Sequence, residues 1–145
     1  MDIKKLCVDF DRSFEMSLTD KVTFSKRVIE IMEQKHWYTS TFEEKTELTR
    51  NIYSDIKSPD YMPTMRIVIS ICVGLELDIF TTTELLRLSG LVLVPTNRVH
   101  YAYNYIIEKC RGMSIRECNE FLEGLEIEET HYLGSHSNEK RKRKA

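Results

Sequence analysis

The segment from Ile67 to Leu77 constrains the fold most, because it is apolar on almost every side of the helix that it predicts. Pro63 and Thr64 stand just before it, and both residue types are common where a helix begins. A helix without a polar face belongs at the centre of a bundle, where neighbouring helices cover it. We therefore expect a central helix over about residues 64–76.

The remaining sequence favours further helices and little strand. Glycine (5) and proline (3) are scarce, and most apolar residues recur three or four positions apart. Thr23, Thr49 and Ser114 are candidate N-caps, and Gly90 and Gly112 are candidate helix ends. The expected helices cover residues 2–16, 24–36, 40–46, 50–57, 64–76, 84–89, 97–111 and 114–122.

The predicted fold class is therefore all-α, a helical bundle, and 145 residues are enough for one compact core. We divide the chain into four regions by their patterns. These are an N-terminal helix (residues 1–20), a core domain (21–91), a helical extension packed on that core (92–127), and a polar, basic, disordered tail (128–145).

The cysteines indicate a reducing compartment, and the hydropathy pattern gives no sign of a membrane span. Cys7, Cys72, Cys110 and Cys118 are far apart, and three of them fall on the apolar faces of predicted helices. We expect buried free thiols rather than disulfides or a zinc site. No apolar run approaches the roughly 20 residues that span a bilayer, and the N-terminus lacks a signal-peptide pattern. These features predict a cytoplasmic protein without a membrane partner.

Charge is unevenly distributed along the chain. The net charge is −2, but all five residues from 140 to 144 are basic. Without them, 16 basic residues face 23 acidic residues, a net charge of −7. An acidic body repels phosphate at long range, so charge alone argues against simple nucleic-acid binding.

Two short predicted helices precede the central one and are separated by a tight turn. Phe42 would be buried in the first helix, Leu48 in the turn, and Tyr53 and Ile56 in the second. This spacing is that of a helix-turn-helix, in which the second helix lies in the DNA major groove and the first braces it.

The segment resembles the Cro and lambda-repressor superfamily over about Phe24–Leu91. The matching parts are Phe24–Met32, Phe42–Thr46, Leu48–Ile56 and Pro63–Leu77, and the last is the most similar. Residues 95–127 look similar to a helical segment that follows in some bacterial proteins of this type. The resemblance implies a phage-repressor-like helix-turn-helix core with additional C-terminal helices.

Three positions depart from the pattern of that superfamily. Tyr38-Thr39 replaces the Thr-Gln that begins the brace helix, where the glutamine holds a phosphate. Glu43 replaces a small alanine where the two helices cross, and Glu47 replaces the glycine of the turn. The motif is therefore degenerate, and Glu43, Glu44 and Glu47 place negative charge close to any bound phosphate.

The DNA-contact candidates lie on and around the second short helix. Arg and Asn pair with guanine and adenine in the major groove, so the base-reading candidates are Arg50, Asn51 and Ser54. The phosphate candidates are Thr39, Lys45, Thr49, Lys57, Arg66, Lys140, Arg141, Lys142, Arg143 and Lys144. The alternative is that all of these are solvated polar positions, with residues 140–144 a solubilising end.

Tyr101 and Tyr105 lie one helical turn apart and allow two interpretations. They are candidate interface residues, because tyrosine is enriched in protein interfaces. The alternative, which we favour, is that they pack beneath the N-terminal helix.

The sequence carries no nucleophile elbow, no glycine-rich phosphate loop and no His or Cys spacing typical of a metal site. We therefore expect no enzyme activity, no cofactor and no metal. The predicted function is a transcription regulator that binds double-stranded DNA as a homodimer. The alternative is a degenerate helix-turn-helix module for protein–protein interaction or regulation, in a phage, toxin–antitoxin or defence system, without sequence-specific DNA binding.

Overall fold

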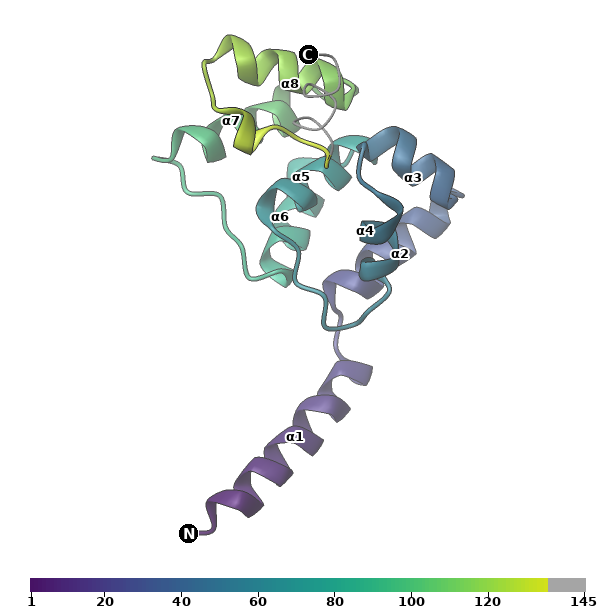
Figure 1. Cartoon of the computed structure of the whole chain (residues 1–145), viewed down its shortest axis with the longest axis vertical. Coiled ribbons are helices and arrows are strands. Elements are labelled where there is room, and N and C mark those ends of the chain that lie inside the picture. The colour runs from purple at the N-terminus through teal and green to yellow at the C-terminus, as the bar shows by residue number, and fades with distance from the viewer. Residues whose placement is uncertain (136–145) are drawn as a thin grey trace.

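The computed structural model describes residues 1–135, and over that range the chain is all-helical, as predicted (Figure 1). The helices are α1 (Ile3–Asp20), α2 (Phe24–Gln34), α3 (Thr39–Thr46), α4 (Arg50–Ile56), α5 (Met65–Gly74), α6 (Ile79–Leu88), α7 (Arg98–Lys109) and α8 (Ile115–Gly124), followed by the 3₁₀ turn η1 (Glu129–His131). No strand occurs in these 135 residues.

Helix α5 is the centre of the bundle, as its apolar sequence predicts. It packs against α3, α6, α7 and α8, while α2 packs against α4 and α6. Val68, Ile69 and Ile71 are fully buried. Burial of one such aliphatic side chain contributes about 1.5–3 kcal/mol relative to exposure, so α5 is the main apolar support of the fold.

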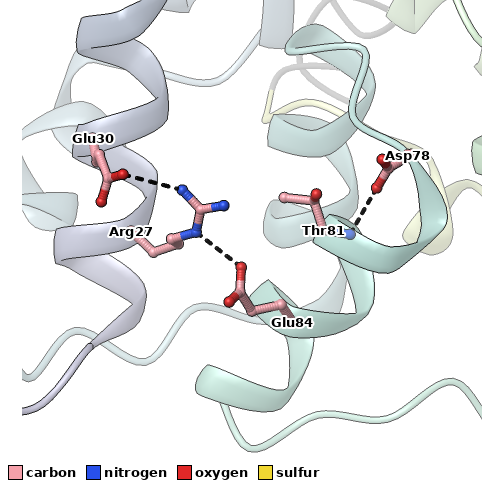
Figure 2. A network of polar contacts seen from close by, with 5 residues as sticks. All are labelled: Arg27, Glu30, Asp78, Thr81 and Glu84. Atoms are coloured by element: carbon pink, nitrogen blue, oxygen red, sulfur yellow. Dashed lines mark hydrogen bonds and ion pairs between the residues drawn. The ribbon is translucent and has the colours of Figure 1, made fainter.

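Helix α6 begins five residues earlier than the predicted Glu84. The carboxylate of Asp78 accepts a 2.8 Å hydrogen bond from the Thr81 backbone N–H and caps the helix (Figure 2). The apolar pair after Asp78 hides this N-cap signal, since Ile and Phe also fit a strand. The same helix is tied to α2, where Arg27 Nε donates to Glu84 Oε1 at 2.9 Å.

Helix α1 projects from the bundle, and no other described helix packs along it (Figure 1). It extends to Asp20, past the predicted end at Met16. Our expectation that Tyr101 and Tyr105 lie beneath the N-terminal helix is therefore wrong. The apolar face of α1 led to the expectation that it packs on the bundle. An amphipathic pattern shows which side of a helix is apolar, but not which residues of the same chain, if any, cover it.

The segment from Tyr132 to Ser135, which we call the C-terminal clasp, packs onto the bundle. Tyr132 and Leu133 are buried at 3% and 1% exposure. Gly134 N–H donates to Ser70 Oγ at 2.9 Å, and Ser135 N–H donates to the Glu47 carbonyl at 2.9 Å. The prediction of a disordered tail from residue 128 is thus wrong for residues 128–135, because the polar composition masked two buried apolar side chains.

The four cysteines are free thiols. Cys72 and Cys118 are buried, as expected, whereas Cys7 is exposed because its helix has no neighbour. None of the helices within residues 1–135 has both the length and the apolarity that crossing a bilayer requires.

Candidate nucleic-acid interface

Helices α3 and α4 meet through the residues that the sequence pattern singled out. Phe42, Leu48 and Ile56 are buried at 0–1% exposure, and Tyr53 is half-buried. The rings of Phe42 and Tyr53 lie 5.2 Å apart, tilted by 57°. Such tilted aromatic pairs are favourable beyond the area they bury. The two short helices therefore share one small apolar contact that fixes α4 on α3.

The turn between these helices forms without glycine. Glu47 adopts the left-handed conformation, with φ 53°, which L-residues other than glycine adopt at a cost. The buried hydroxyl of Thr46 supports it by donating to the Phe42 carbonyl at 2.6 Å and accepting from Leu48 N–H at 3.1 Å. Glutamate at the glycine position thus leaves the backbone of the turn in the conformation that glycine favours.

Close packing of α3 onto the bundle depends on Gly74, which sequence analysis did not single out. A Cβ at this position would lie 2.9 Å from the Lys45 carbonyl oxygen and 2.9 Å from Thr46 Cγ2. Only a residue without a side chain fits there unless α3 moves. A glycine at the end of an otherwise continuous apolar helix was the available signal.

The exposed side of α4 carries the three base-reading candidates. Arg50, Asn51 and Ser54 are all exposed, and so is Asp55. Thr49 is the N-cap, because its hydroxyl accepts from the Ile52 N–H at 3.3 Å. The structure therefore places the base-reading candidates together on one accessible helix, with an acid beside them.

Two of the basic candidates already have local partners. Arg50 Nε lies 3.7 Å from Glu43 Oε1, in an exposed pair that joins α4 to α3. Lys57 Nζ lies 4.9 Å from the centroid of the Tyr53 ring, which is within the range of a cation–π contact. Both contacts are at the surface, so both cations remain accessible.

The phosphate candidates are not all on one surface element. Thr39 begins α3, and Lys45 is exposed near its end. Arg66 on α5 holds the C-terminal clasp instead, because its Nη1 donates to the Gly134 carbonyl at 3.2 Å. The basic residues from 140 to 144 lie outside the described residues.

Tyr101 and Tyr105 line a separate groove of about 460 Å³ between α7 and α8. The Tyr105 ring stacks on Phe121 with 5.6 Å between centroids, and Tyr101 is 62% exposed. At the rim of the groove, Arg98 Nη2 donates to the Leu125 carbonyl at 2.8 Å. These tyrosines are thus accessible, but they lie away from the α3–α4 pair.

Within residues 1–135, no three His, Cys, Asp or Glu side chains gather as a metal ion would require. Comparisons with protein-family models, with curated proteins and with solved structures found no match to this chain.

Proposed function

We propose that this protein is a non-enzymatic transcription regulator that binds double-stranded DNA through the α3–α4 pair, used as a helix-turn-helix. The observation that carries the proposal is the Phe42–Tyr53 contact, which buries the inner side of α4 and leaves Arg50, Asn51 and Ser54 exposed. In a helix-turn-helix, the exposed early residues of the second helix contact base edges. The left-handed turn at Glu47 supports the same arrangement.

Four exposed residues have a specific role in this proposal. Arg50 pairs with guanine and Asn51 with adenine in the major groove. Lys45 and Lys57, which are both exposed, contact phosphates on either side. Arg66 is not among the proposed phosphate contacts, because its guanidinium donates a hydrogen bond to the Gly134 carbonyl.

The position of the C-terminal clasp supports a further phosphate contact. Ser135 is bonded to Glu47, in the turn between α3 and α4. Lys140 follows five residues later in the sequence. The basic run from 140 to 144 therefore stays among the proposed phosphate contacts, as positive charge on a chain whose other residues are net acidic.

A homodimer is part of the proposal. One seven-residue helix reads only a few base pairs, and proteins of this class bind two half-sites through paired subunits. A cytoplasmic location fits this function, because all four cysteines are free thiols.

The test is the salt dependence of binding to a random-sequence duplex. Binding is measured through the fluorescence of a label at one end of the DNA. Lys45→Ala and Lys57→Ala, which remove the proposed phosphate contacts, should each flatten the slope of log K against log salt by about one unit. Arg116→Ala, an exposed position on α8, is the matched control and should leave the slope unchanged. Absence of binding at low salt contradicts the proposal. So does binding that is lost only on deletion of residues 140–144.

The second candidate function is protein interaction without DNA. A hollow of about 350 Å³ lies between α2 and α4 and is lined by five largely apolar side chains and two charged ones, namely Ile29, Met32, Trp37, Tyr53, Ile56, Glu33 and Lys57. Acidic Glu43 and Glu44 on α3 oppose a phosphate backbone. This candidate replaces the first if the duplex does not bind at low salt.

A further inference from the structure

The groove between α7 and α8 has the size and the lining of a site for a small molecule. Its volume of about 460 Å³ lies within the range of about 300–1,000 Å³ that small-ligand pockets occupy. Its lining comes from three segments: the loop before α7 (Pro95 and Thr96), α7 itself, and the end of α8 (Phe121 and Leu125). None of the DNA-contact candidates on α3 and α4 lines it.

Aromatic side chains form much of this lining. The rings of Tyr105 and Phe121 stack on each other with 5.6 Å between their centroids, which ties α7 to α8. Tyr101 lies one helical turn before Tyr105 and is 62% exposed, and its ring stacks on no other ring within residues 1–135. Ala102, at 4% exposure, adds only a methyl group to the lining. The groove therefore offers a flat ligand an aromatic ring to stack on and room beside it.

A single cation stands at the rim of the groove. Of the described residues, Arg98 is the only charged one that lines it. The hydrogen bond from its Nη2 to the Leu125 carbonyl, at 2.8 Å, orients the guanidinium and uses one of its five N–H donors. No carboxylate within residues 1–135 forms an ion pair with Arg98. An anion in the groove would therefore meet an oriented guanidinium that the described part of the protein leaves without a counter-charge.

We propose that this groove binds a small planar aromatic carboxylate. The ring of the ligand stacks on Tyr101, and its carboxylate accepts charge-assisted hydrogen bonds from Arg98. Arginine suits this anion because the planar guanidinium matches the geometry of a carboxylate. The site is separate from the proposed DNA surface, and its occupation does not depend on DNA binding.

Charge distinguishes this ligand from other occupants and this groove from other hollows. The hollow between α2 and α4 is lined by both Glu33 and Lys57, so it offers an anion no net attraction. The basic residues 140–144 of the chain itself would meet a like charge at Arg98. A neutral aromatic compound would fill the volume but gain nothing from the charge of the guanidinium. An aromatic carboxylate uses both the rings and the cation.

The test is calorimetric titration of the full chain with benzoate, phenylacetate and naphthoate, each compared with its neutral primary amide. Compounds of this size reach dissociation constants of about 1 mM in a matched site. At least one of the acids should saturate a single site at that affinity or better, and its amide should bind at least about fivefold more weakly. Backbone NMR shifts caused by the acid should cluster at residues 95–102 and 121–125.

Variants of Arg98 test the role of charge. Arg98→Gln should weaken binding of the acid about tenfold and change binding of the amide by no more than about twofold. Arg98→Lys should restore part of the loss, because it returns the charge without the planar geometry. Arg116→Gln is the matched control, since Arg116 is exposed on α8 but does not line the groove.

Variants of Tyr101 test the role of stacking. Tyr101→Ala should weaken the acid and the amide alike, by about threefold, whereas Tyr101→Phe keeps the ring and should change neither. Tyr38→Ala is the control, because it removes a tyrosine of similar exposure (73% against 62%) from another surface.

Three results would overturn the proposal. These are a chain that none of the acids saturates up to about 10 mM, equal affinity for acid and amide, and NMR shifts that cluster on α1 or in the hollow between α2 and α4. All titrations are made without DNA, so their outcome is independent of the test of DNA binding.

Discussion

The Glu43 carboxylate lies 3.7 Å from Arg50 Nε, so the arginine proposed to read bases faces an acid of the preceding helix. The pair is exposed and therefore stabilises the fold by no more than about 1 kcal/mol. In the proposed function, its larger effect is to lower the affinity for DNA, because Glu43 competes with the base for Arg50 and repels phosphate.

Glu43→Ala should therefore raise affinity for duplex DNA by about two- to fivefold at low salt. Glu44→Ala is the control, since it removes the same charge from an exposed neighbour of α3. Titration of a labelled duplex with both variants measures the difference. An equal gain in both would show that only net charge matters, and that the contact with Arg50 does not.

Gly74→Ala should destabilise the fold by about 1–3 kcal/mol. The new methyl group would meet the Lys45 carbonyl at 2.9 Å and force α3 outward, although alanine favours a helix more than glycine does. Gly124→Ala is the matched control, because nothing lies within 4 Å of a Cβ there. Urea denaturation should show a loss of stability for the first variant and none for the second.

Asn119→Ala should release the C-terminal clasp. The Asn119 side chain accepts from Leu133 N–H at 2.7 Å and donates to the Leu133 carbonyl at 3.1 Å. Its removal leaves two backbone groups unpaired at a buried residue, which costs about 1–3 kcal/mol. Hydrogen exchange should rise at residues 133–135. Asn104→Ala, which loses one hydrogen bond to Glu108 in its own helix, should leave that exchange unchanged.

Thiol reactivity should separate the cysteines by their burial. Burial raises the pKa values of Cys72 and Cys118 to about 12, so neither forms a thiolate near pH 8. Cys7, which is exposed, should react with a disulfide reagent within minutes, while these two should react only after unfolding. Mass spectrometry of the modified peptides gives the order, and early labelling of Cys72 would contradict the packing of α5.

The cap of α6 should make stability depend on acidity. The Thr81 backbone hydrogen bond lowers the pKa of Asp78 below its ordinary value. A lowered folded-state pKa stabilises the fold above the unfolded pKa, near 3.9, and this stabilisation is lost as the pH falls through the folded value. Asp78→Ala should therefore lower the Tm more at pH 6 than at pH 2.5. Equal losses at the two pH values would contradict a charged cap.

Much of the fold could be predicted from sequence because its signals are local. These signals are the apolar run at Ile67–Leu77, the caps at Thr23 and Thr49, and the spacing of Phe42, Leu48 and Ile56. Each lies within a stretch of at most 15 residues, and the structure confirms them. The base-reading candidates followed from the same spacing, and their exposure together on α4 agrees with it.

The features that sequence analysis missed depend on contacts between separate elements, which no pattern within one helix reveals. Gly74 matters because of Lys45, and Leu133 is buried because Asn119 and the elements around Ser70 receive it. The outward direction of α1 depends on Lys26, whose role as a C-terminal cap no periodicity reveals. Each of these features needs two segments that meet only in the folded chain, and the sequence alone does not show that they meet.

The C-terminal clasp also has a kinetic consequence. Most helices of this bundle complete their contacts with near neighbours in sequence, which favours fast folding. The clasp joins Ser135 to Glu47 and Gly134 to Ser70, so these loops close over 88 and 64 residues (135−47 and 134−70), and closing such long loops costs more entropy than closing short ones. Because the chain is synthesised from its N-terminus, the face of α5 around Ser70 stays uncovered until the last of the 135 described residues has been made.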